Sequence, residues 1–223
     1  MNEFALGFGV AALANGILVT IVVTIAASLV AIVFGLIVGL IRVSTLWPLR
    51  WLGIAYIEFF RGTSQLVQLY WWFFVLPIFG ITLSSWTVAI FGIGLCISGY
   101  GAEVVRGAIQ SIDRGQYEAS TALNFPRLTM MRRIVLPQAL RAMLPPWGNL
   151  LIELLKGTSL VFFITITEFT AAAKIAADAT GNYLLFFAVA LFGYYVIARA
   201  FITPFVRLLE RRFSRGFVRE VLA

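Results

Sequence analysis

The sequence has no histidine and a single cysteine, which excludes several kinds of chemistry. Without histidine the chain cannot form a His-metal centre, and it cannot assemble a Ser-His-Asp or Cys-His catalytic group. One thiol, Cys96, excludes a disulfide framework. Charged residues are also scarce, because they make up 12% of the 223 residues, about half of what a soluble domain carries.

Apolar residues, by contrast, make up 61% of the chain, and the mean hydropathy is +0.96. A chain of this length has too little interior to hide so many apolar side chains from water. Its 20 phenylalanines and six tryptophans also exclude the composition of a disordered segment. The sequence therefore predicts a protein whose solvent is lipid.

A helix needs about 20 apolar residues to cross the hydrocarbon core of a bilayer, and five segments meet that requirement. We predict an all-α, polytopic membrane protein with five transmembrane helices, forming a single domain over residues 1–223. The first span is expected to remain in the mature chain, because no Lys or Arg precedes it and its apolar run is too long for a signal peptide. The expected spans are 14–41, 54–79, 86–109, 142–167 and 183–206.

Cations concentrate in alternate connections, and short loops rich in Lys and Arg stay in the cytoplasm. The connection at 80–85 has no charge, whereas the first connection, the third connection and the tail are basic. This pattern predicts an outside N-terminus and an inside C-terminus, and it explains the net charge of +7 without nucleic-acid binding. The arginines on the predicted cytoplasmic side are Arg42, Arg50, Arg114, Arg127, Arg132, Arg133, Arg141, Arg207, Arg211, Arg212, Arg215 and Arg219.

The third connection, 110–141, is the only long one, and such loops usually have a function. Residues 117–123 are small and compatible with a helix, and Asn124 follows where a left-handed residue would end the turn. A second short helix is predicted over 127–135, stopped by Leu136-Pro137 before the next span. The loop is thus expected to form a helix-turn-helix knob on the cytoplasmic face.

The residues of this loop match a known pattern of Glu-Ala-Ala, Gly, Ile and Leu-Pro at fixed separations. Here the sequence resembles the integral-membrane permease subunits of bacterial binding-protein-dependent ABC importers. Two positions differ, Ser for Ala and Asn for Gly, and both keep the size or the backbone freedom that the turn requires. The matching residues are Glu118, Ala119, Ser120, Asn124, Ile134, Leu136 and Pro137.

Two further segments, 58–68 and 101–107, look like the polar amino acid permeases of that family. Ser64 stands where the subfamily has Pro, and this variant is reminiscent of ectoine-type permeases. The resemblance implies a multi-pass protein of the bacterial inner membrane that translocates a small polar or zwitterionic solute of the polar amino acid class. Ectoine, hydroxyectoine or a similar compatible solute is the alternative.

The resemblance also implies partners. The loop would dock on an ABC ATPase dimer, which binds ATP and Mg, so this chain is expected to be no enzyme and to hold no cofactor or metal. The segment Lys156-Gly157-Thr158-Ser159 indeed lacks the preceding Gly-rich turn of a nucleotide site. A second permease subunit, either homologous or a second copy, and an extracytoplasmic solute-binding protein complete the assembly. The expected docking residues are Glu118, Ala119, Ser120, Ala122, Asn124, Ile134, Leu136 and Pro137.

An ion-coupled secondary transporter is the rival class. Such carriers rely on inverted repeats, and no internal repeat relates residues 1–109 to residues 110–223. A cytoplasmic knob is also a feature that an ion-coupled carrier does not need. The importer is therefore the favoured interpretation.

Three acidic residues inside the spans are each followed by a cation three residues later. One interpretation is that each pair neutralises itself on one helix face, which is expected for the pair near the cytoplasmic end of the third span. The other, open for the remaining two, is that the carboxylate contacts solute. The pairs are Glu58 with Arg61, Glu103 with Arg106, and Glu153 with Lys156.

The second span is interrupted at 62–64, and the fourth carries a polar run at 156–159 at comparable depth. Irregular backbone at that depth is tolerated only inside protein or beside an aqueous cavity. A zwitterion needs acceptors for its ammonium group and donors for its carboxylate, and the two segments offer both. The predicted pathway residues are Glu58, Thr63, Ser64, Gln65, Gln68, Glu153, Lys156, Thr158 and Ser159.

Overall fold

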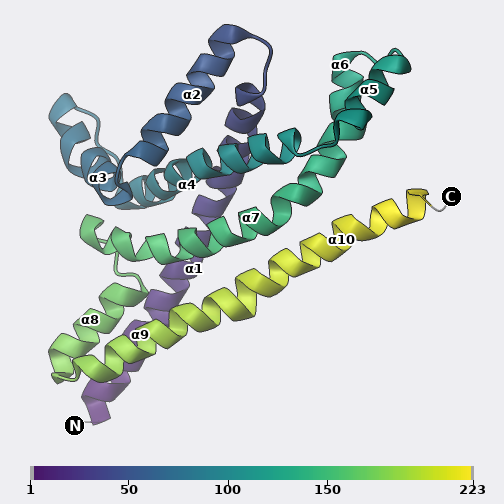
Figure 1. Ribbon diagram of the computed structural model, residues 1–223. Coiled ribbons are helices and arrows are strands. Elements are labelled where there is room, and N and C mark those ends of the chain that lie inside the picture. Colours follow the sequence, from purple (N-terminus) through teal and green to yellow (C-terminus); the bar gives the residue numbers. More distant parts are fainter. Residues whose placement is uncertain (1–2, 222–223) are drawn as a thin grey trace.

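The computed structural model describes residues 3–221, with side chains from 11 to 213, and all regular structure in this part is helical (Figure 1). The predicted tail cations Arg215 and Arg219 fall outside the described side chains. The α-helices are α1 (Glu3–Arg42), α2 (Trp47–Gly62), α3 (Gln65–Tyr70), α4 (Ser85–Gln110), α5 (Arg114–Ala122), α6 (Arg127–Met130), α7 (Leu136–Gly157), α8 (Phe169–Thr180), α9 (Tyr183–Ile197) and α10 (Thr203–Val221). Short π- or 3₁₀-helical turns join some of them: η1 (Trp71–Val75), η2 (Leu76–Phe79), η3 (Met131–Val135), η4 (Thr158–Ile164) and η5 (Ala198–Ile202).

Four of the described helices are long and apolar enough to cross a membrane. They correspond to the first, third, fourth and fifth predicted spans, and the third agrees with 86–109 to within one residue at each end. A shorter apolar helix, Gln65–Phe79, lies within the second predicted span. The count of five and the orientation stay predictions. The four long helices are Ala11–Arg42, Ser85–Gln110, Arg127–Ile164 and Tyr183–Phe213.

The predicted interruption of the second span is confirmed. Helix α2 ends at Gly62, and Thr63 and Ser64 have extended backbone before α3 begins. The side-chain amide nitrogen of Gln68, Nε2, donates to the Phe60 carbonyl at 3.2 Å and to the Thr63 hydroxyl at 2.6 Å. These bonds hold the break together, because a carbonyl freed inside a membrane protein must find another donor.

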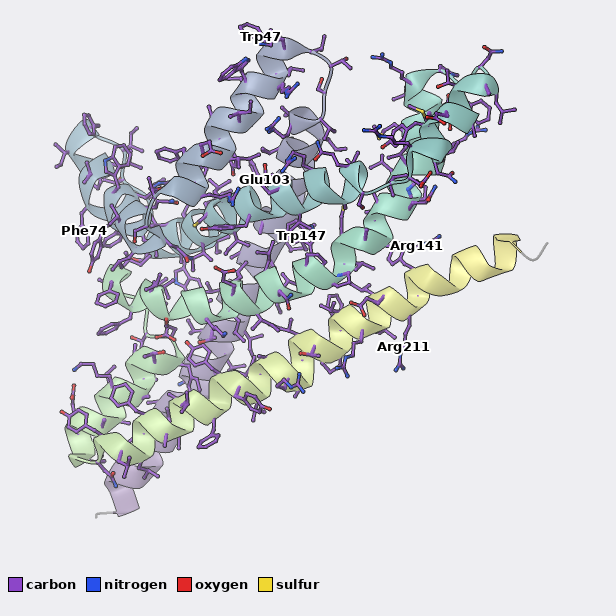
Figure 2. All side chains as sticks on the ribbon, viewed as in Figure 1. Trp47, Phe74, Glu103, Arg141, Trp147 and Arg211 are labelled. Atoms are coloured by element: carbon purple, nitrogen blue, oxygen red, sulfur yellow. The ribbon has the colours of Figure 1, made fainter. Side chains whose placement is uncertain are left out.

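The core lies where α1, α4 and α7 meet. The ring of Trp147, from α7, is buried between glycines of α1 and α4, as its central position in Figure 2 also indicates. A Cβ atom added to Gly35 would lie 2.8 Å from that ring, and one added to Gly101 would lie 2.4 Å from it. Both contacts are shorter than carbon atoms tolerate, so these positions require glycine.

We expect Gly101→Ala to destabilise the protein by about 1–3 kcal/mol, because the new methyl group overpacks a rigid indole ring. The matched control is Gly107→Ala on the same helix, where an added Cβ meets no heavy atom within 4 Å. That change should leave stability equal or raise it by about 0.5–1 kcal/mol, since Ala favours helix. The unfolding midpoint of the purified chain in detergent measures both. An unchanged midpoint for Gly101→Ala contradicts the packing described above.

One prediction about the loop is wrong. Leu136-Pro137 does not stop the helix that begins at Arg127, because α6, η3 and α7 continue without interruption. The π-helical turn η3, in which the Leu136 N–H bonds to the Met131 carbonyl, widens the backbone just before the proline. Pro137 directly follows the widened turn, has no N–H to bond back into it, and the helix continues past it. The knob is therefore joined rigidly to the next span.

The orientation predicted from the arginines can be measured with reporter fusions. We expect reporters placed after Glu3 and Gly80 to read outside, and those after Trp47, Arg127 and Ala223 to read inside. The physical reason is the retention of basic loops in the cytoplasm. Alkaline phosphatase and green fluorescent protein activities report the two sides, and a reversed pair contradicts the five-span topology.

Candidate coupling and translocation site

The knob at 110–141 is built around α5 and its two ends. The Asp113 carboxylate caps the N-terminus of α5 by accepting from the Gly115 N–H at 2.6 Å. At the other end Asn124 has φ +56°, and the N–H groups of Asn124 and Phe125 bond back to Thr121 and Ser120. This is a Schellman-type helix end, so the left-handed residue predicted at Asn124 is confirmed.

The knob is fastened to the membrane helices by polar contacts. Tyr117 donates its hydroxyl to the Ile109 carbonyl at the end of α4 at 3.1 Å, and burial raises the pKa of Tyr117, which keeps it a donor. Gln138 at the start of α7 donates to the Gln116 side chain at 3.4 Å. These two bonds tie α5 to both α4 and α7.

The predicted docking residues divide between the outside and the inside of the knob. Glu118, Ala119, Ala122, Asn124 and Pro137 are exposed, Ile134 and Leu136 are half-buried, and Ser120 is 1% exposed. Ser120 therefore packs inside the knob, which explains the small residue there. Three apolar side chains are also exposed beside these positions, and they are Leu123, Phe125 and Leu128.

The break after α2 meets the end of α7. An added Cβ at Gly157 would lie 3.0 Å from the amide nitrogen of Gln65, so these two segments touch, as their shared depth suggested. Gln65 Nε2 and Gln68 Oε1 are buried and have no hydrogen-bond partner within the described part of the chain. Two polar atoms at the junction therefore have unused hydrogen-bonding capacity.

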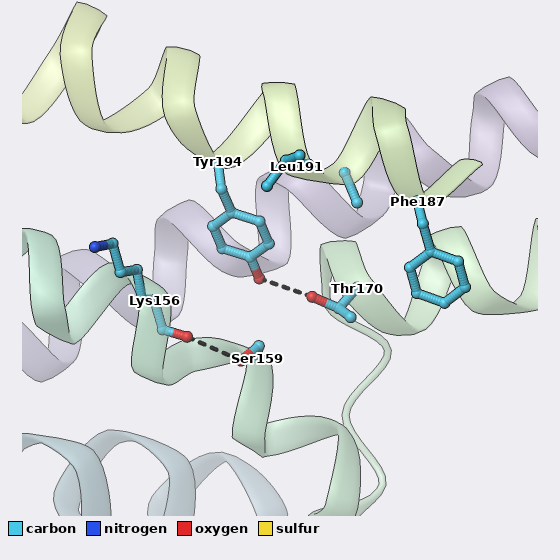
Figure 3. A pocket seen from close by; sticks show the side chains of 7 residues that line it. Lys156, Ser159, Thr170, Phe187, Leu191 and Tyr194 are labelled. Atoms are coloured by element: carbon cyan, nitrogen blue, oxygen red, sulfur yellow. Dashed lines mark hydrogen bonds between the residues drawn. The ribbon is translucent and has the colours of Figure 1, made fainter. Parts of the chain in front are cut away.

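Four of the nine predicted pathway residues line two hollows. Thr63 and Gln68 line one of about 700 Å³. Lys156 and Ser159 line another of about 360 Å³ beside α9, where Tyr194 also points (Figure 3). The remaining members differ in exposure: Glu58, Ser64 and Glu153 are exposed, Gln65 is half-buried and Thr158 is buried.

The three predicted ion pairs have different outcomes. Glu103 and Arg106 form the expected pair at 2.6 Å, on the half of α4 that leads to the knob; Figure 2 labels Glu103. Neither Glu58 nor Glu153 forms an ion pair with its neighbour among the described residues. For these two carboxylates, neutralisation by the neighbouring cation and contact with solute both stay predictions.

Two features were missed by sequence reasoning. Arg61 lies over the ring of Tyr100 at 5.3 Å, although it was expected to face Glu58. Glu168 is fully buried, where it accepts from the N–H groups of Thr170 and Ala171 and from the Tyr194 hydroxyl at 2.6 Å. Glutamate is not a common helix cap, so the sequence carries no strong signal for the second feature.

Comparisons with known proteins give the family. The profile described as "Binding-protein-dependent transport system inner membrane component" matches residues 31–215, which is most of the chain. The chain belongs to this family. It is a membrane-spanning component of a transport system of the inner membrane, and the resemblance drawn from the knob residues is confirmed.

The chain is also similar to individual transporter proteins and to a solved structure. The chain is 43% identical over 169 residues to the probable amino-acid ABC transporter permease protein y4tF of Sinorhizobium fredii, covering 73% of this chain and 71% of that protein. It is 35% identical over 205 residues to the L-cystine transport system permease protein TcyB of Bacillus subtilis, with 91% and 87% covered. A crystal structure of an amino acid ABC transporter with histidines has a TM-score of 0.86 at 29% identity, covering 95% of this chain and 99% of that one. The prediction of an ABC transporter permease is confirmed.

Proposed function

We propose that the chain is the membrane-spanning subunit of an ATP-driven importer for a small polar or zwitterionic solute of the polar amino acid class. An extracytoplasmic binding protein delivers the solute, and a second permease subunit faces this one. The single observation that carries the proposal is the knob, which exposes Glu118 and is fastened to α4 and α7. The names of the relatives support the solute class.

Energy enters through the knob. An ATPase dimer, which holds ATP and Mg, docks on the exposed face formed by Glu118, Ala119 and Ala122. Apolar Leu123 and Leu128, which are 66% and 80% exposed, are buried on docking and contribute hydrophobic free energy. Because η3 leads into α7 without a stop, movement of the ATPase turns the membrane helices directly.

Solute passes beside the two breaks. Glu58 and Glu153 are exposed carboxylates without an ion pair in the described part of the chain, and such groups need water or a cationic ligand inside a membrane. An ammonium group supplies that charge. Ser64 offers a hydroxyl group in the same break, whereas the Thr63 hydroxyl donates to the Phe59 carbonyl and accepts from Gln68.

The test is reconstitution of this chain with its ATPase and its binding protein in proteoliposomes. We expect uptake of at least one radiolabelled polar amino acid from a panel containing glutamine, arginine and cystine. Uptake should require ATP on the ATPase side and the binding protein on the other, because the chain has no nucleotide site of its own.

Each alternative gives a different result in that assay. Uptake driven by a sodium or proton gradient without ATP contradicts the importer and favours a secondary transporter. Uptake of labelled ectoine with no amino acid uptake contradicts the solute class and leaves the ATP-driven mechanism standing.

A further inference from the structure

Arg61, in the last turn of α2, is held in place by the neighbouring helix. Its guanidinium lies 5.3 Å from the centre of the Tyr100 ring, and its stem passes close to Gly99 of α4, where an added Cβ would lie 3.4 Å from Arg61 Cγ. A cation over an aromatic face is attracted by the negative charge of that face. The side chain is exposed and yet preorganised.

The charge of Arg61 is not balanced within the described part of the chain. Glu58, one turn earlier, forms no ion pair with it. Glu103 is the acid nearest on α4, and it accepts from both Nε and Nη2 of Arg106, at 2.9 and 2.6 Å. Arg42 and Arg61 also lie within electrostatic range of Glu103, so three guanidinium groups share one carboxylate there.

The depth of Arg61 makes an unbalanced charge costly. Since a helix rises 1.5 Å per residue, Tyr100 lies about 15 Å from Gln110 and about 22 Å from Ser85 along α4. This position is in the middle third of the span, where a cation without water or an anion is strongly disfavoured. The chain leaves this position uncovered, because Arg61 is exposed and a Cβ added to the adjacent Gly62 meets nothing within 4 Å.

Resting on the proposed function, we infer that Arg61 binds the carboxylate of the transported amino acid and that Tyr100 is its positioning residue. The planar guanidinium donates two parallel hydrogen bonds that match the two oxygens of a carboxylate. Glu58, three residues earlier on the same helix, then lies within reach of the ammonium group of the same solute. The chain thus selects free α-amino acids over their uncharged C-terminal derivatives.

The experiment uses the purified complex of this chain with its ATPase. The probe is an amino acid that the wild-type complex transports, compared with the α-carboxamide of the same amino acid. In the wild type, millimolar amino acid is expected to raise the unfolding midpoint and the carboxamide is not. In Arg61→Gln neither compound should raise it, and uptake should fall at least tenfold while ATPase co-purification is retained.

Matched variants separate binding from folding. Arg50→Gln makes the same change near the start of α2 and should keep both the ligand effect and uptake. Tyr100→Phe keeps the aromatic ring and should behave as wild type. In Tyr100→Leu, uptake should fall several-fold. Arg61→Lys keeps the charge without the planar fork and should fall between wild type and Arg61→Gln.

Two results overturn the inference while the proposed function stands. One is amino acid uptake in Arg61→Gln equal to that of the wild type. The other is a wild-type complex that transports amino acids but responds to amino acid and carboxamide alike, or to neither. Absence of amino acid uptake in the wild type contradicts the proposed function itself.

Discussion

Reversing the charge of Glu118 is expected to reduce the amount of ATPase that co-purifies with the chain at least tenfold and to abolish ATP-driven uptake. Glu118 is exposed on α5 and has no ion pair in the described part of the chain, so its carboxylate is available to a partner. A charge-assisted contact across an interface is worth about 1.5–3 kcal/mol, and a lysine there adds repulsion to its loss. The measurement is quantitative affinity purification followed by uptake in proteoliposomes.

The control for Glu118→Lys is Asp178→Lys on α8, at the opposite end of the molecule from the knob (Figure 1). It makes the same charge change at an exposed helix position, and it removes a surface pair with Lys174 and a hydrogen bond from the Tyr183 hydroxyl. ATPase co-purification should be unchanged in this control. Normal co-purification and normal uptake in Glu118→Lys would reject the docking role.

Replacing Glu58 by Gln is the second change with a large expected effect, and it should lower uptake at least tenfold without loss of assembly. The amide keeps the shape of the side chain and removes the charge that attracts an ammonium group. Folding should be preserved, because Glu58 is exposed and forms no ion pair with Arg61. Uptake and the unfolding midpoint are measured on the same preparation.

Glu103→Gln is the contrasting variant, because Glu103 does pair with Arg106 at 2.6 Å. The pair is partly exposed, so its loss should cost at most about 1 kcal/mol of stability. For Glu58 the decisive variant is the double change Glu58→Gln with Arg61→Gln. Recovery of uptake in that double variant would show that Glu58 merely neutralises Arg61.

Predictions from the sequence were correct where the interacting residues are close together along the chain. Asn124 was predicted to be left-handed from the helix that precedes it, and its φ of +56° follows from bonds that stay within five residues. The interruption at 62–64 was visible for the same reason. Pro137 misled, because it follows the π-helical turn η3, and no single residue marks that turn in the sequence.

The sequence by itself determined that this chain is a membrane protein. It also determined the positions of most of the spans and showed that the long loop is that of an ABC permease. Composition, span length and motif spacing are properties of the chain alone, and for that reason they were readable. Only the tertiary structure decided which of three similarly spaced carboxylates pairs with its cation. The spacing permits each pair, but Arg61 meets Tyr100, 39 residues away along the chain, through the packing of α2 on α4. The partner of a side chain depends on all the groups that pack around it, and the packing of helices is a property of the folded molecule.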